Sequence, residues 1–296
     1  MKRREFAKLT ALSTTLGFTN LKAFSESFYQ EGKFEMKLLR NDVGVFTSRG
    51  GTIVWRIAKD GLAVIDSQFQ ESAEMLIGEI GKKQKGKIDL LLNTHHHGDH
   101  SNGNIAFEGI AKKVVAHQNS KTNQERVAKK GNRLDDVLLP DTTFESDWSG
   151  KVGKETITAT YFGSAHTDGD SIIHLENANV AHLGDLLFHE MHPYIDTSAG
   201  ANIQNWIVVL ENIRKKYDDD TIFVYGHSAK GEIAGGKDKI IAKEAYLHGL
   251  LDFVGREKKA GKSKEEIQET TVLPGFDFGD RRLSANLGTA FDELSQ

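Results

Sequence analysis

The most informative segment of this chain reads Asn93-Thr94-His95-His96-His97-Gly98-Asp99-His100. The run 87–93, apolar with polar flanks, is typical of a buried strand, and the glycine-containing segment 98–103 suits a tight loop. The pattern is His-X-His-X-Asp-His, which offers four potential metal ligands in six consecutive residues. The sequence therefore predicts a metal site at the carboxyl end of a strand.

The spacing of the four ligands predicts two neighbouring ions. Alternate side chains share one face of an extended backbone, so His95 and His97 can present two imidazoles to one ion, whereas His96 points the other way. Past the strand the chain turns, and Asp99 with His100 can reach a second ion. A separation of roughly 3.5–4 Å between the ions is typical of two-metal hydrolases.

Three more ligand-type residues follow strand-like segments elsewhere in the chain. They are His166 after 157–165, Asp185 after 180–184 and His227 after 222–226, each beside a glycine or another small residue. For the histidine run alone, a surface patch or a chance sequence is the simpler interpretation. Four strand ends that all offer His or Asp favour a metal site.

The order of these motifs resembles the metallo-β-lactamase superfamily, from about residue 44 to about residue 228. The resemblance implies an α+β fold, the four-layer αββα sandwich, in which two β-sheets pack face to face with helices outside. It also implies a metal site at one edge of the sandwich. Carried over to this sequence, it assigns His95, His97 and His166 to the first metal, Asp99, His100 and His227 to the second, and Asp185 to a bridge between both.

Zinc is the expected metal, as two Zn²⁺ ions, because imidazole and carboxylate ligands suit it; the same ligands also accept iron or manganese. Two ions that share a water lower its pKa from ~15.7 towards ~7 and so supply hydroxide at neutral pH. Asp99 is the expected catalytic residue, a carboxylate that accepts or shuttles the proton. Asp66 matches an acidic position that in the family often supports the metal ligands from behind; a surface turn is the alternative.

The first 25 residues resemble a twin-arginine export signal. Arg3 and Arg4 form the basic pair, and the weakly apolar stretch 9–18 is too short for a membrane span. Cleavage near Ser25 would leave residues 26–296 as the catalytic domain, in the periplasm or outside the cell, with no membrane span in the mature chain. A basic helix of a cytosolic protein and an uncleaved anchor are the alternatives.

Charge and composition narrow the partners to small molecules. The signal carries five basic residues and one acidic residue, so its removal changes the net charge from −4 to −8. An acidic protein without a basic stripe is not expected to bind nucleic acid. The chain has no cysteine, which excludes disulfides and a thiolate ligand and departs from the β-lactamases that place a cysteine on the second metal.

Periodicity predicts the elements around the site. Residues 37–46, 52–58 and 62–66 are predicted to be strands of the first sheet, with Asp60-Gly61 as a hairpin signal. Asn202 is expected to cap a helix, and residues 238–256 are expected to form another. The apolar stripe of the first helix, which is interpreted as core, contains Ile203, Trp206, Ile207, Leu210 and Ile213.

The segment 186–196 directly follows Asp185 and is expected to pass the mouth of the pocket. It offers His189, His192 and Tyr194 as candidates for substrate binding. Phe188 stands three residues after Asp185, where thiolate-type β-lactamases usually have a lysine, so a dedicated β-lactamase is less expected than promiscuous activity.

Three enzyme functions stay open. The first is a dinuclear zinc hydrolase of a small ester, lactone, thioester or amide. The second is β-lactam hydrolysis, and the third is an iron-dependent persulfide dioxygenase, which uses the same fold with fewer ligands. A complete second ligand set argues for hydrolysis, and it also argues against a non-catalytic binding module.

Overall fold

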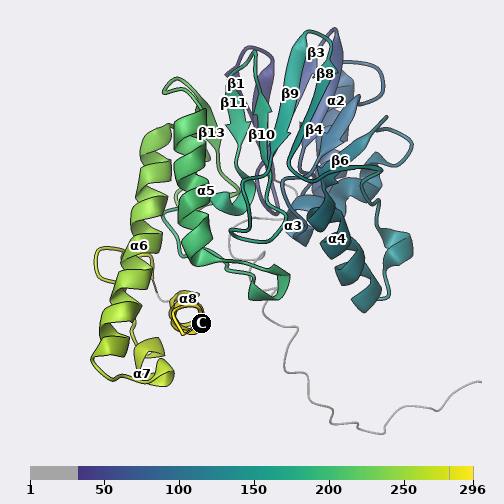
Figure 1. The fold of residues 1–296 in the computed structure, drawn as a ribbon. Coiled ribbons are helices and arrows are strands. Elements are labelled where there is room, and N and C mark those ends of the chain that lie inside the picture. The colour runs from purple at the N-terminus through teal and green to yellow at the C-terminus, as the bar shows by residue number, and fades with distance from the viewer. Residues whose placement is uncertain (1–32, 280, 296) are drawn as a thin grey trace, which may run out of the picture.

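Two β-sheets packed face to face, with helices on their outer faces, form the core of the molecule (Figure 1). The structure, a computed structural model, describes residues 33–279 and 281–295. It confirms the predicted α+β sandwich with four layers. The predicted export signal, residues 1–25, lies outside the described residues, so the signal and the domain boundary at residue 26 stay predictions.

The first sheet has seven strands in sequential order. The first four strands are antiparallel neighbours, and β4 to β7 are parallel. The strands are β1 (Glu35–Arg40), β2 (Val43–Thr47), β3 (Ile53–Ala58), β4 (Gly61–Ile65), β5 (Leu90–Leu92), β6 (Val114–His117) and β7 (Thr142–Phe144). The parallel half places the carboxyl ends of four strands at one edge, where the histidine-rich segment begins.

The second sheet has six strands in the order β15-β13-β11-β10-β9-β8. These are β8 (Asp147–Val152), β9 (Glu155–Thr160), β10 (Ile172–Leu175), β11 (Val180–His182), β13 (Ile222–Val224) and β15 (Ala234–Gly235). A small third sheet pairs β12 (Phe188–His189) with β14 (His227–Ser228) in parallel. It joins the segment after Asp185 to the segment that begins with His227.

Alternation along the strands produces the layers. In β3, Val54 packs between the sheets, whereas Ile53 and Trp55 pack under a helix on the outer face. In β4, Ala63 packs between the sheets and Val64 packs on the outer face. Successive side chains of a strand point to opposite faces, so strands that are apolar at every position are buried on both sides.

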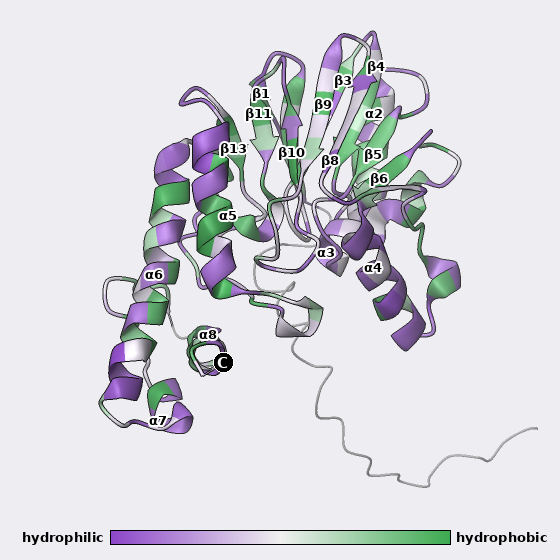
Figure 2. Cartoon of the chain, viewed as in Figure 1, coloured by the Kyte–Doolittle hydropathy of each residue, from purple (hydrophilic) through white to green (hydrophobic). Residues whose placement is uncertain are grey.

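The helices cover the two outer faces. In sequence order they are α2 (Gln70–Lys83), α3 (Gly98–Ser101), α4 (Gln118–Lys130), α5 (Ile203–Lys216), α6 (Lys237–Lys259), α7 (Lys264–Gln268) and α8 (Leu283–Glu293). Helix α2 packs on the first sheet and α5 on the second, whereas α6 packs against α5, and α8 packs against α6 and α7. The ribbon of α5 in Figure 2 has an apolar stripe on one side and hydrophilic residues on the other.

Within residues 33–279 and 281–295, four short 3₁₀ turns complete the secondary structure: Asn102–Phe107, Leu134–Asp136, Gly184–Leu186 and Thr197–Ala199. Among the described residues, no helix combines the length and the apolar character that crossing a membrane requires.

One predicted strand was wrong. Residues 37–46 form parts of two antiparallel strands, β1 and β2, because the chain reverses at Asn41, which has a φ of +53°. Asn tolerates this left-handed conformation better than most residues, and it was the missed turn signal. The predicted helix after Asn202 is confirmed, since the Asn202 side chain accepts a hydrogen bond from the Asn205 backbone at 2.6 Å and the predicted apolar stripe is buried.

Burial on α5 generates a stability prediction. Replacing fully buried Leu210 by alanine (Leu210→Ala) should lower the free energy of unfolding by about 2–5 kcal/mol, because a cavity forms in the core. Val208 lies on the same helix and is 47% exposed, so Val208→Ala should change it by no more than about 0.5 kcal/mol. Urea unfolding of both variants measures the difference. Equal losses would contradict this packing of α5.

Candidate active site

The ligand-type residues come from loops at one edge of the sandwich. His95 lies in a bend just after β5, and Asp185 lies in the 3₁₀ turn after β11. His166 lies in the connection between β9 and β10, and His227 begins β14. Strand β5 ends at Leu92, so His95 and His97 lie beyond the strand in a bent segment, although both side chains still reach the same centre.

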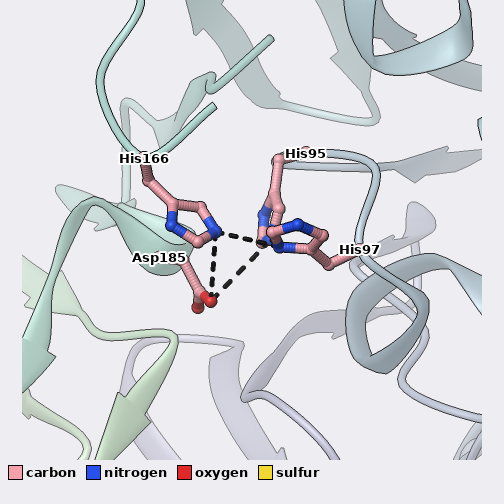
Figure 3. A group of neighbouring side chains, drawn as sticks. All are labelled: His95, His97, His166 and Asp185. Carbon is pink, nitrogen blue, oxygen red and sulfur yellow. Dashed lines mark hydrogen bonds and ion pairs between the residues drawn. The ribbon is translucent and has the colours of Figure 1, made fainter. Parts of the chain in front are cut away.

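The first cluster, defined as His95, His97, His166 and Asp185, brings one ligand atom of each residue within 4.8 Å of the others. Figure 3 shows the imidazoles and the carboxylate turned toward a common centre. His97 Nδ1 lies 3.1 Å from His95 Nε2 and 2.9 Å from His166 Nε2. Asp185 Oδ2 lies 3.5 Å from His166 Nε2 and 3.8 Å from His95 Nε2.

The second cluster, defined as Asp99, His100 and His227, lies on the other side of Asp185. His227 Nε2 lies 3.2 Å from Asp99 Oδ2 and 3.4 Å from His100 Nε2. Asp185 Oδ1 lies 3.1 Å from His100 Nε2 and 3.4 Å from His227 Nε2. The two oxygens of Asp185 therefore face different clusters, which is the geometry of a bridging carboxylate.

Hydrogen bonds on the outer side of the imidazoles set which nitrogen faces inward. The outer contacts are His97 Nε2 to Asp196 Oδ2 at 2.9 Å, His166 Nδ1 to the Tyr194 carbonyl at 2.8 Å, His100 Nδ1 to Asp66 Oδ2 at 2.8 Å, and His95 Nδ1 to Thr94 Oγ1 at 3.0 Å. An imidazole that donates outward keeps the lone pair of its other nitrogen for a ligand bond. Four lone pairs are thus directed into the clusters.

Asp66 lies beneath both clusters and is fully buried. Its carboxylate accepts hydrogen bonds from the backbone N–H and the hydroxyl of Thr94, both at 2.8 Å. It also contacts His100 Nδ1 at 2.8 Å and His182 Nε2 at 3.1 Å. Asp66 thus occupies the supporting place that the family resemblance implied, and its φ of +64° turns the chain sharply after β4.

Sequence reasoning missed two residues of this network. His182 is fully buried on β11 and hydrogen-bonded to Asp66. Asp196, not singled out, orients His97, and its Oδ1 accepts from the backbone N–H and the hydroxyl of Ser198. Neither lies near its hydrogen-bond partner in sequence, since Asp196 is 99 residues from His97 and His182 is 116 residues from Asp66. The Asp-X-Ser pattern, typical of a turn, was the available signal for Asp196.

Two glycines allow the clusters to close. A Cβ at Gly51 would overlap the ring of His100, and a Cβ at Gly226 would overlap Asp185 Oδ1. Both positions lack the space for any larger residue, so the loop before β3 and the end of β13 approach the ligands by backbone alone.

The carboxylates in the two clusters favour the binding of cations. Burial lowers the pKa of His227, but Asp185 and Asp99 outweigh it and raise this pKa to about 9. Burial raises the pKa of Asp185, yet His227 and His100 hold it well below its usual value. The carboxylates therefore stay charged at neutral pH and draw positive charge to the imidazoles, as a proton or as a metal ion.

The surroundings of one atom, Asp185 Oδ1, also suit a bound metal ion. Asp185 Oδ1 is buried and makes no hydrogen bond within the described part of the chain, although two imidazole nitrogens lie within 3.4 Å. Inward lone pairs at such distances repel one another and the carboxylate oxygen unless a cation lies between them. The nitrogen and oxygen donors match zinc and related divalent ions.

The three residues predicted to bind substrate lie in different surroundings. Tyr194 is 43% exposed, and its ring centroid lies 5.4 Å from that of His97, at the rim of the first cluster. His189 pairs with Glu232 at 3.0 Å. The prediction for His192 was wrong, because the residue is buried and both of its ring nitrogens already have partners: the Tyr246 hydroxyl at 2.8 Å and the Gly279 carbonyl at 3.0 Å.

Comparison with known proteins agrees with this geometry. Residues 50–227 match the family model described as "Metallo-beta-lactamase superfamily". The chain is 25% identical over 226 residues to a metallo-β-lactamase type 2 of Elizabethkingia meningoseptica, covering 73% of this chain and 86% of that protein. It is 23% identical over 246 residues to a metallo-β-lactamase type 2 of Bacillus cereus, covering 76% and 93%.

Solved structures share the fold. A metallo-β-lactamase from Pontibacter korlensis aligns with a TM-score of 0.61 at 18% identity, over 73% of this chain and 99% of that one. A double mutant of the sec-alkyl sulfatase PisA1 aligns with a TM-score of 0.66 at 15% identity, over 88% of this chain and 50% of that one. The family model covers more than half of the chain, and the motif residues that it spans form the two clusters. The chain belongs to the metallo-β-lactamase superfamily of metal-dependent hydrolases.

Proposed function

We propose that this protein is a dinuclear zinc hydrolase that cleaves a small ester, lactone, thioester or amide. The observation that carries the proposal is the position of Asp185, whose two oxygens face two separate sets of imidazoles. A single-metal oxygenase would use the first cluster alone, whereas here Asp99, His100 and His227 complete a second one. This supports hydrolysis over persulfide oxidation.

The proposed ligands divide between the clusters. His95, His97 and His166 would hold one ion, and Asp99, His100 and His227 the other, with Asp185 shared. Bound divalent ions supply Lewis acidity and a water whose pKa falls towards ~7. The remaining chemistry belongs to the side chains.

Asp99 has the environment of a proton acceptor. Burial raises its pKa, but His227 and His100 outweigh that effect and keep the pKa well below its usual value, so the group is a carboxylate at neutral pH. Its side chain is 23% exposed, which is more than any other side chain of the two clusters. It can take the proton that the attacking water loses and deliver it to the leaving group.

β-Lactam hydrolysis is the second candidate, because curated relatives at 22–25% identity are named metallo-β-lactamases. Phe188 packs against the cluster, with its ring stacked on His227 at 5.4 Å, and offers no charge to a drug carboxylate from that position. We also propose export to the periplasm or beyond, on the pattern of residues 1–25.

A substrate screen tests the proposed reaction. Purified protein is assayed with chromogenic esters, lactones, a thioester and a cephalosporin, with and without chelator. Chelator-sensitive turnover of an ester, thioester or lactone supports the proposal. Turnover of the cephalosporin alone favours the β-lactamase, and one iron per chain with no hydrolysis favours the dioxygenase.

Metal content separates one site from two. Elemental analysis of the purified protein should give about two zinc ions per chain. His227→Ala should give about one, because it removes a ligand from the second cluster only. The control His248→Ala changes an exposed histidine on α6 and should keep two. Two retained ions in His227→Ala would contradict the ligand assignment.

Orientation of His97 by Asp196 yields another prediction. Asp196→Asn should weaken zinc binding by about 10- to 100-fold, because the partner that fixes the His97 tautomer loses its charge. Competition with a chromogenic chelator measures the affinity. Asp219→Asn, whose side chain is 95% exposed, should leave the affinity unchanged and serves as the control. Unaltered affinity in Asp196→Asn would show that this contact does not support the metal.

Proton transfer by Asp99 is tested by Asp99→Asn. We expect kcat per metal-loaded chain to fall about 10²- to 10⁴-fold, because the amide cannot accept the proton. Metal content is measured on the same samples, so loss of the ion is separated from loss of the base. A variant that keeps both metals and its kcat would exclude this role.

A further inference from the structure

A buried amine lies behind the two clusters. Lys243 lies on α6, outside the residues 50–227 that match the family model, and is 4% exposed. Its Nζ makes no hydrogen bond to any residue that the structure describes. A buried polar group without a hydrogen bond lowers stability, so packing of the helix alone does not account for a lysine at this position.

Three aromatic rings surround the amine. Nζ of Lys243 lies over the rings of Tyr246, Trp206 and Phe188, at 4.7, 5.0 and 5.4 Å from their centroids. These rings come from three elements, α6, α5 and β12. The N–H groups of a lysine, charged or uncharged, are attracted to the negative face of an aromatic ring. The amine therefore fixes the three rings relative to one another.

Two of these rings contact ligands of the clusters. The Phe188 ring is stacked on the imidazole of His227, with 13° between the planes and 5.4 Å between the centroids. The centroid of the Trp206 ring lies 5.7 Å from that of His166. His227 belongs to the second cluster and His166 to the first. One aromatic ring thus separates Lys243 from a ligand of each cluster.

The surroundings of Lys243 favour an uncharged amine beside bound metal ions. Burial lowers the pKa of Lys243 well below its usual value, whereas the carboxylate of Asp185 favours the charged form. Metal ions bound to that carboxylate would compensate its charge, which leaves the effect of burial. An uncharged amine adds no repulsion toward the ions and still directs its N–H groups to the rings.

We propose that Lys243 is a positioning residue, which orients one ligand of each cluster through the rings of Phe188 and Trp206. Groups outside the ligand set often fix the orientation of metal-binding imidazoles, and their loss weakens metal binding. This role rests on the proposed function, because it concerns the same two metal sites. Lys243 acts through the rings and takes no part in the chemical step.

Lys243→Met tests the proposal, because methionine is also long and unbranched but has no N–H group. Competition with a chromogenic chelator should show zinc affinity lowered about 10-fold, the smaller end of the effect of such outer partners. The free energy of unfolding of the metal-free protein should not fall, since an unpartnered buried amine is removed. Unchanged or tighter zinc binding would overturn the proposal.

A double-mutant cycle shows whether Lys243 acts through the rings. Phe188→Leu removes the ring that is stacked on His227 and should itself weaken zinc binding. Added to Phe188→Leu, Lys243→Met should weaken binding at the second cluster by less than about twofold, because the path through that ring is already gone. Fully additive losses would show that the lysine and the ring act separately, and would overturn the proposal.

Leu247→Met is the matched control. Leu247 is fully buried on the same helix, and this exchange conserves volume in the core. It should bind zinc as the parent protein does. The same loss of affinity in Leu247→Met would mean that any change in the packing of α6 loosens the clusters, and the specific role of Lys243 would be overturned.

A measurement without metal separates this role from the proposed function. Nitrogen–proton correlation spectra of the imidazoles in the metal-free protein should show altered signals of His227 and His166 in Lys243→Met and parental signals in Leu247→Met. Parental signals in both variants would overturn the positioning role. A parent protein that binds fewer than two ions would instead contradict the two-metal hydrolase and leave this comparison intact.

Discussion

The buried carboxylate of Asp66 is the interaction on which the site depends. Asp66 directly follows β4 of the first sheet. Its carboxylate accepts hydrogen bonds from Thr94 and His100 of the histidine-rich segment. It also contacts His182 on β11 of the second sheet. One charged group thus fixes the loop of one sheet against a strand of the other, and a fully satisfied buried network of this kind is rigid.

This rigidity holds the imidazoles and the carboxylate of the clusters in an arrangement that is unfavourable without bound cations. Asp185 lies between two groups of imidazoles whose lone pairs converge, and outer partners such as Asp196 hold those groups in place. The packed fold therefore holds these groups close together despite their repulsion, and bound cations would relieve that repulsion. Because the ligands come from several loops, the site exists only after both sheets have packed.

The C-terminal helices lie outside the segment that matches the family model. Loops and added helices vary among proteins that share one fold, while the sandwich stays constant. Here α8 is joined to the rim by Asn286, which contacts Pro193 beside Tyr194.

The sequence alone determined much of the site, because the motif His-X-His-X-Asp-His and three further strand ends carry their chemistry locally. Periodicity also determined the helix after Asn202, whose cap and apolar stripe lie within one segment. The hairpin at Asn41 was missed because the polar residues Arg40, Asn41 and Asp42, which signal the turn, lie within the range predicted as one strand.

Only the tertiary structure decided which distant groups meet. Asp196 lies 99 residues from His97, His182 lies 116 residues from Asp66, and neither pairing leaves a trace in local pattern. Likewise, His192 has the sequence surroundings of a pocket residue, yet the packing of α6 buries it against Tyr246. Hydrogen bonds between remote segments depend on how sheets and helices pack, and a local sequence pattern contains no distance across that packing.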